Sequence, residues 1–222
     1  MSEVNQTPRT RKPRSDGERS RSAILREAAK LATVEGLDGL SIGRLASAVG
    51  MSKSGLFAHF GSKEELQLAT IAAASDVFTH EVVEPAASAP NGLERLRQLC
   101  ENFLRHVAGD AFPGGCFFAS VAAELDTRPG PVRDVAIQLV NGWTTMLESA
   151  ARDARAEGAI AADEDPAQLA FEVDAYLLLA NAHYVITGQQ TPLDRARAAL
   201  ERRLGVAAYD ARGTRPVRAL SS

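Results

Sequence analysis

The most informative segment of the chain is residues 40–63, which read LSIGRLASAVGMSKSGLFAHFGSK. Ser41 stands directly before a run of apolar residues at helical spacing and is expected to be a helix N-cap, and a further helix is expected to begin near Ser52. Gly50 separates the two helices, where a sharp turn needs a residue that tolerates positive φ. Ala46, four residues earlier, is small enough for two helices to cross closely. The segment therefore predicts a helix-turn-helix.

The second short helix of this motif is expected to present small or polar groups on its outer face. Apolar residues would lock the helix crossing, namely Leu45, Val49, Met51 and Leu56. The exposed remainder would be Ser52, Lys53, Ser54, Gly55, Phe57 and His59. Such a face can enter the major groove of DNA without blocking it. We expect Phe60, like Leu56, to belong to the core.

Helical patterns continue on both sides of this segment. Ser62 and Glu65 have the spacing of a capping box and are expected to open a helix that reaches about residue 83. Asp165-Pro166 and Thr191-Pro192 should each start a helix, with the first residue as N-cap. Other helices are expected at 18–35, 92–107, 116–125 and 132–150. No alternating strand pattern stands out, so the prediction is an all-α fold with about nine helices.

Charge is distributed unevenly along the chain, although the net charge is only −3. Residues 1–63 carry 11 Lys/Arg and 6 Asp/Glu, whereas residues 64–222 carry 14 and 22. A basic module on an acidic body is typical of proteins that approach phosphates through a local field. Residues 1–15 contain Arg9, Arg11, Lys12 and Arg14, and are expected to form a disordered basic arm. This arm would either reach DNA or serve only as a solubilising tail.

Several functional classes are disfavoured by what the sequence lacks. It has no Gly-rich phosphate loop, GxSxG elbow or HExxH motif, so we expect no enzyme, no catalytic residue and no cofactor. Cys100 and Cys116 have neither CxxC spacing nor a nearby His, which favours reduced, buried thiols over a metal site. The most apolar stretch, residues 175–186, is too short to span a bilayer. We therefore expect a cytoplasmic protein that does not contact membranes.

Two runs carry a resemblance to a known family. Residues 56–60, LFAHF, followed by Lys63-Glu64-Glu65-Leu66, resemble the N-terminal domain of the tetracycline-repressor (TetR) family, and the likeness extends over residues 23–68. The run GGCFF at 114–118, with Glu124 and Arg128-Pro129, is similar to one C-terminal subtype. The resemblance implies a basic arm at 1–15, a DNA-binding domain at 16–62, a helical ligand-binding and dimerisation domain at 63–206, and a flexible tail at 207–222.

The resemblance also implies roles for individual residues. Ser41 would meet a phosphate, and His59 and Lys63 would touch the DNA backbone. The base edges would be faced by Ser52, Lys53, Ser54 and Gly55. Phe57 stands where the family often has Tyr, so it is expected to pack on a sugar or a thymine methyl instead of donating to a phosphate.

In the second domain the resemblance implies a ligand pocket and a homodimer. The helix over 175–186 is apolar nearly all round and is expected to pair with the following helix and their dimer mates. Candidate pocket residues are Phe78, Phe103, His106, Phe117, Phe118, Trp143, Met146, Tyr176 and His183, for each of which an ordinary core role is the alternative.

The predicted function is a transcriptional regulator, a repressor that binds a palindromic double-stranded operator as a homodimer and is released by a small-molecule effector. The alternative is a helical small-molecule-binding protein, or a regulator that acts by protein contact, without operator binding. The sequence identifies neither the effector nor the operator.

Overall fold

The computed structural model describes residues 16–125 and 129–208. Within these ranges the chain forms nine α-helices, and its only β-type pairing is one antiparallel bridge between Ile160 and Ala208. The all-α prediction is therefore confirmed. The α-helices are α1 (Asp16–Glu35), α2 (Ile42–Ala48), α3 (Lys53–Phe60), α4 (Lys63–Phe78), α5 (Gly92–Ala108), α6 (Phe117–Leu125), α7 (Pro131–Ala156), α8 (Pro166–Thr187) and α9 (Thr191–Ala207).

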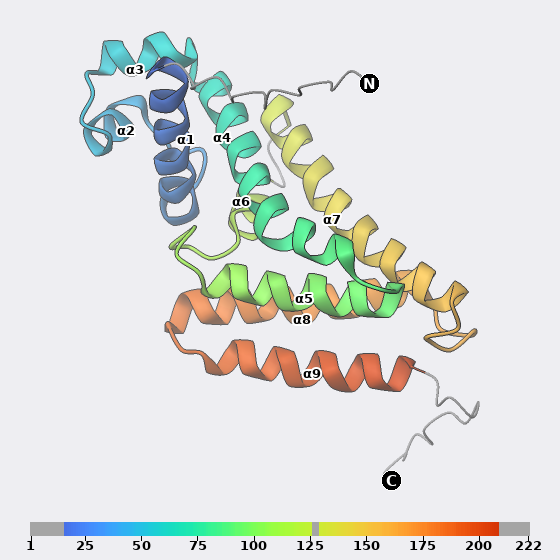
Figure 1. Ribbon diagram of the computed structural model, residues 1–222. Coiled ribbons are helices and arrows are strands. Elements are labelled where there is room, and N and C mark those ends of the chain that lie inside the picture. The colour runs from blue at the N-terminus through green and yellow to red at the C-terminus, as the bar shows by residue number, and fades with distance from the viewer. Residues whose placement is uncertain (1–15, 126–128, 209–222) are drawn as a thin grey trace, which may run out of the picture.

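The helices form a small head and a larger body (Figure 1). The head contains α1, α2, α3 and the start of α4, whereas α5, α8 and α9 lie together at the opposite end of the molecule. Helices α4 and α7 run between the two regions and contact each other. Because α4 begins in the head and ends in the body, it links the two mechanically.

Two clusters of buried apolar side chains stabilise this arrangement. One lies in the body and gathers residues of α5, α7, α8 and α9 around Phe103 and Leu147. The other lies in the head around Leu45 and Leu56, and it also includes Phe117 of α6. Burial of a large apolar side chain contributes about 1.5–3 kcal/mol. The head therefore shares its core with α6 and is not packed independently of the body.

The helix that begins after Ser62 differs from the expectation at its C-terminal end. Its α-helical part ends at Phe78, and the chain continues through a π-helical turn, Thr79–Val83, and a 3₁₀ turn, Glu84–Ser88. Pro85 gives the physical reason, because proline has no N–H and its ring clashes with the carbonyl four residues earlier. Helical structure thus reaches residue 83, as expected, but its last turn is π-helical and not α-helical.

The two proline-led helix starts also differ from each other. Asp165 caps α8, and its carboxylate accepts a hydrogen bond from the Ala167 N–H at 3.0 Å, as expected. Thr191 is not the N-cap of α9, because it already lies inside the helix and Gln190 occupies the cap position without a side-chain hydrogen bond. Pro192 fixes φ near the helical value and starts the helix without such a cap.

Both cysteines are free and buried, as the sequence predicts. Burial raises the pKa of Cys100 to about 12 and that of Cys116 to about 11. Since the thiolate is the reactive form, both thiols should stay protonated at neutral pH.

We expect neither thiol of the native protein to react with a thiol-specific disulfide reagent at pH 8 on the timescale of minutes. Both should react within seconds in denaturant, where the pKa returns to about 8.5. Absorbance of the released chromophore measures the number of reacted thiols. Rapid reaction of the native protein would contradict the burial of these side chains.

Candidate functional site

The helix-turn-helix is built by local hydrogen bonds that its sequence specifies. The Ser41 hydroxyl accepts from the Arg44 N–H at 3.2 Å at the start of α2, and the Ser52 hydroxyl accepts from the Gly55 N–H at 3.1 Å at the start of α3. Gly50 adopts φ of +67° in the turn between them, which favours glycine. Leu56 is fully buried beneath α3. These contacts fix the angle at which α3 leaves the head.

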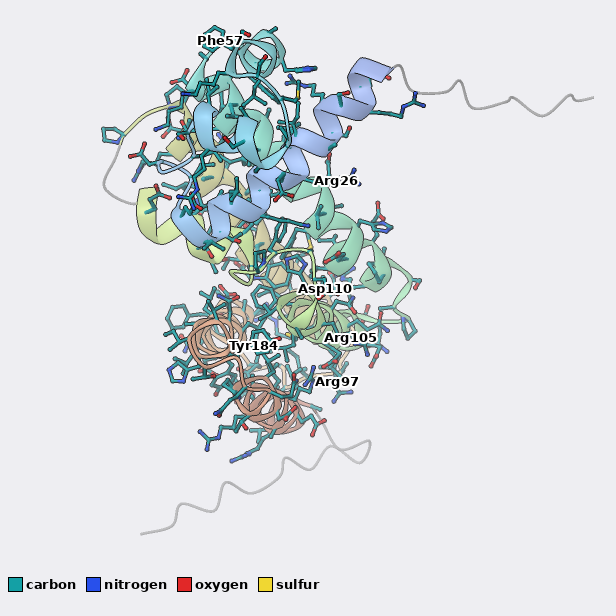
Figure 2. All side chains as sticks on the ribbon, turned by 90° about the vertical axis from the view of Figure 1, so that its left-hand side faces the viewer. Arg26, Phe57, Arg97, Arg105, Asp110 and Tyr184 are labelled. Atoms are coloured by element: carbon teal, nitrogen blue, oxygen red, sulfur yellow. The ribbon has the colours of Figure 1, made fainter. Side chains whose placement is uncertain are left out.

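The outer face of α3 exposes small and polar side chains together with one large aromatic ring. Ser52, Lys53 and Ser54 are exposed, and 51% of Phe57 is exposed. Figure 2 shows Phe57 at the outer end of the head, farthest from the body. Gly55 and His59 are half-buried. Phe60, in contrast, is buried under the guanidinium of Arg21, which lies 4.4 Å from the ring centroid.

Lys63 lies beside the head's α1–α2 loop. Its ammonium donates to the Asp38 carbonyl oxygen at 2.6 Å and lies 3.2 Å from Asp38 Oδ1. One turn further along α4, the Gln67 amide donates to the Leu37 carbonyl at 2.9 Å in a buried position. The loop is therefore held directly by the first turns of α4.

A second hold on the same loop comes from the body. The Glu124 carboxylate of α6 accepts from the backbone N–H groups of Leu37 and Asp38, both at 2.6 Å. Gly36 has φ of +82°, and a Cβ there would lie 2.9 Å from the Glu124 carboxylate. We call this pair of hydrogen bonds the Glu124 clamp. It joins residues 87 and 86 positions apart, so spacing along the sequence gave no signal for it.

The body contains a cavity of about 490 Å³ between α4, α5, α6, α7 and α8. This volume lies in the usual range for small-molecule sites. Its walls are mostly apolar and include Phe78, Phe103, Phe118, Leu139, Trp143, Met146 and Leu178, with Ser75, Thr79, Gln138, Asp174 and Asn181 as polar members. Phe78 is the last residue of α4, so this end of the linking helix forms part of the cavity wall.

Aromatic contacts inside the body converge on Phe78. Its ring meets those of Phe118 and Trp143 edge to face, with centroid distances of 5.9 and 5.2 Å. Phe103 stacks on Trp143 at 5.7 Å with an interplanar angle of 23°. Such pairs contribute about 0.5–1.5 kcal/mol each beyond burial. A molecule that separates these rings would therefore act on the end of α4.

One acidic side chain lies in this aromatic setting. Asp174 of α8 accepts a hydrogen bond from the Trp143 indole N–H at 2.9 Å. Burial raises the pKa of the Asp174 carboxyl, and the hydrogen bond from Trp143 opposes part of that rise. Asp174 was not among the residues predicted to line the pocket. Its position inside an apolar helix was a visible signal, but the pairing with Trp143 was not.

The predicted pocket residues separate into two groups. Phe78, Phe103, Phe118, Trp143 and Met146 line the cavity, and their role as ligand contacts stays a prediction. The other four, His106, Phe117, Tyr176 and His183, lie elsewhere.

The reasons differ among these four. Phe117 packs into the head cluster, because α6 turns it towards Phe112. Tyr176 packs against the body cluster, and His183 is exposed on α8. His106 is buried behind Phe78, with its Nδ1 2.5 Å from Glu81 Oε2.

In the described ranges no group of three His, Cys, Asp or Glu side chains gathers that could hold a metal ion. The basic arm at 1–15, Arg128 of the C-terminal run, and residues 209–222 of the expected tail lie outside the described residues.

Comparison with known proteins agrees with this architecture. Residues 24–70 match the bacterial regulatory proteins of the tetR family, and residues 92–200 match the tetracyclin repressor-like C-terminal domain. The chain is 26% identical over 172 residues to the transcriptional regulator AcuR of Cereibacter sphaeroides, which covers 75% of this chain and 78% of AcuR.

Two solved structures are also similar. A TetR transcriptional regulator from Chloroflexus aurantiacus has a TM-score of 0.77 and 25% identity, over 84% of this chain and 94% of that one. AibR, in complex with isovaleryl coenzyme A and operator DNA, has a TM-score of 0.68 and 26% identity, over 82% of this chain and 97% of AibR. Family models match both the N-terminal and the C-terminal region of the chain, and the solved TetR regulator has the same fold. The chain therefore belongs to the TetR family of transcriptional regulators.

Proposed function

We propose that this protein is a cytoplasmic repressor that binds a palindromic operator as a homodimer and is released from it by a small molecule held in the body cavity. The observation that carries the proposal is α4, whose first turns hold the α1–α2 loop of the head and whose last residue, Phe78, lines the cavity. AibR, a relative of similar fold, has both an operator and a small molecule bound in its structure.

The first test is an anisotropy titration of the purified protein against DNA from upstream of its own gene, at two salt concentrations. Tight, salt-sensitive binding with a palindromic footprint is expected. If a folded dimer selects no sequence from a random DNA pool, the protein does not bind an operator. The alternative, a small-molecule-binding protein or a regulator that acts by protein contact, then replaces this proposal.

For DNA recognition we assign Lys53, Ser54, Gly55 and Phe57 on the outer face of α3 to the bases, with Ser52 both capping the helix and facing the groove. Ser41, His59 and Lys63 are assigned to the DNA backbone. Support comes from exposure, since Phe57 and Lys53 lie at the surface although burial would be the ordinary place for a phenyl ring. Lys63 would exchange its contact with Asp38 for a phosphate at the N-terminus of α4.

Replacing Lys63 with Ala should weaken binding to all DNA sequences about equally. It should also lower the slope of log K against log salt by about 0.9, the value for one phosphate contact. Replacing Ser54 with Ala should instead alter base preference at one position of the half-site. Titrations against a panel of half-site variants measure both effects.

Lys30→Ala is the matched control, since Lys30 is an exposed lysine at the far end of α1. Equal losses for Lys63→Ala and Ser54→Ala on every sequence would contradict these assignments.

The dimer is supported by an apolar stripe on α8. Seven residues that share one helical face are all exposed in the single chain: Phe171, Ala175, Leu178, Leu179, Ala182, Val185 and Ile186. Steps of three and four residues connect them along the helix, so they share one face of α8. An exposed apolar surface of this extent marks an interface in a soluble protein.

A membrane is the other apolar environment that α8 would suit. Within the described residues α8 alone is long and apolar enough to span one, with about a third of its apolar window buried. Glu172, which binds Arg203 and Gln168, and Asp174, which binds Trp143, lie within it. Carboxylates are costly to place in lipid, and these two bind partners within the fold of this domain. Pairing with a second copy therefore fits α8 better.

Introducing Asp at Leu179 or Ile186, which are 59% and 79% exposed, should convert the dimer to a monomer. Burying an isolated charge in an apolar interface costs several kcal/mol. Light scattering at micromolar concentration measures the mass, and Gln189→Asp, beyond the end of α8, provides the charge control. A wild-type protein that is already monomeric would overturn the dimer.

Release from DNA requires that the DNA-bound and the released conformations of the protein differ in their affinity for the ligand. The cavity contacts the head by two routes, through Phe78 at the end of α4 and through α6, which carries Phe118 at the cavity and Glu124 at the loop. Movement of either helix would change the position of the α1–α2 loop and therefore of α3 in each half of the dimer.

The Glu124 clamp can be tested without a ligand. Glu124→Gln replaces one acceptor oxygen by an amide donor that faces a backbone N–H, so one of the two hydrogen bonds is lost. Amide hydrogen exchange at Leu37 and Asp38 should accelerate about tenfold, the equivalent of ~1.4 kcal/mol. Exchange in α9 should be unchanged, and operator affinity should fall. Unaltered exchange at both amides would show that the clamp does not hold the loop.

A further inference from the structure

The charge of the cavity is determined by one side chain. Among the described residues that line it, Asp174 is the only acidic one, and none of these residues is Lys, Arg or His. Cys116 also lines the cavity, but burial raises the pKa of its thiol to about 11, so the thiol is neutral near pH 7. The described part of the cavity wall therefore holds one ionisable carboxyl group and no basic group.

This carboxylate lacks a cationic partner within the described part of the chain. Two arginines of the neighbouring helix α9 are engaged elsewhere, as Arg203 binds Glu164 and Glu172, and Arg197 binds Glu101 and Asp194. The contact that Asp174 does make is with the neutral indole N–H of Trp143. Burial without a cation disfavours the charged form, which agrees with the raised pKa of this carboxyl.

Aromatic rings complete the environment. Trp143, Phe78, Phe103 and Phe118 all line the cavity. Ring faces attract cations, most strongly the indole, and this attraction is stronger where water is excluded. A carboxylate beside several rings therefore favours one class of guest over an uncharged molecule of the same shape.

We propose that the effector of this protein is an organic cation with an apolar body, whose ammonium group lies against Asp174 and Trp143 and whose body lies against Phe78. This inference rests on the proposed function, in which the cavity is the effector site. The positive charge would stabilise the ionised form of Asp174, and the apolar body would act on the end of α4. An anionic ligand would meet Asp174 with no basic group among the described lining residues to receive its charge.

Trp143 makes the test direct, because it is the only tryptophan in the chain and its indole lines the cavity. Titrations would follow its fluorescence with three compounds of equal length: 4-phenylbutyl-trimethylammonium, its uncharged tert-butyl isostere, and 5-phenylpentanoate. We expect the cation to bind at least about tenfold more tightly than the isostere, and the carboxylate to bind most weakly.

Asp174→Asn is the decisive variant, because Asn keeps the shape and can still accept from the Trp143 N–H. It should abolish the preference for the cation while leaving the affinity for the isostere within about twofold. Without ligand, the variant should lose less stability than the wild type as the pH rises from the ordinary Asp pKa through the raised pKa of Asp174, because Asn does not ionise. Glu148→Gln, which removes a carboxylate of α7 that binds Arg152 and does not line the cavity, should leave the cation preference intact.

The outcomes separate this inference from the proposed function. If the isostere or the carboxylate binds as tightly as the cation, or if Asp174→Asn keeps the preference, the ligand class is wrong even where that compound releases operator DNA. If the cation binds in an Asp174-dependent manner but leaves operator affinity unchanged, the ligand class stands and release by this cavity fails.

Discussion

The continuity of α4 is the constraint on which the rest of the molecule depends. A helix of 16 residues is about 24 Å long and is hydrogen-bonded along its length, so its two ends cannot move independently. Its first turns hold the α1–α2 loop through Lys63 and Gln67, and its last residue, Phe78, is part of the cavity wall. A change in the cavity therefore has a short and stiff path to the head.

The Glu124 clamp adds a second path to the same loop. Helix α6 carries Phe118 at the cavity and Glu124 at the backbone of Leu37 and Asp38. Phe117, the first residue of α6, packs in the core of the head. Since α4 and α6 reach one loop from two sides, a displacement of one relative to the other would be converted into a tilt of the helix-turn-helix. The π-helical turn after Phe78 gives α4 a place where such a displacement can be absorbed.

Three features of the chain oppose stability, and each coincides with a surface to which we assign a function. Phe57 exposes its ring at the tip of the head, α8 exposes a stripe of apolar side chains, and Asp174 keeps a carboxylate among aromatic rings. A sequence selected only for folding would place polar residues at the first two positions and an apolar residue at the third. Conflicts of this kind are expected where binding, and not packing, decides the residue.

The amino-acid sequence by itself determined the helices, the helix-turn-helix and the family. These features depend on local rules, such as the N-caps at Ser41, Ser52 and Asp165, the turn at Gly50, and apolar spacing along single helices. The local rules failed after Phe78, where the effect of Pro85 reached back along the helix, and at Thr191, where Gln190 is the cap.

Only the tertiary structure decided which side chains meet across the body. The predicted pocket residues of α4, α5, α6 and α7 were each ambiguous between core and cavity. Four aromatic residues and Met146 line the cavity, whereas Phe117 and His106 do not. The Trp143–Asp174 hydrogen bond joins residues 31 positions apart, and the Glu124 clamp joins residues more than 80 apart. Such pairs depend on the angles at which whole helices cross. Those angles result from the packing of all the helices together, and no single stretch of sequence specifies them.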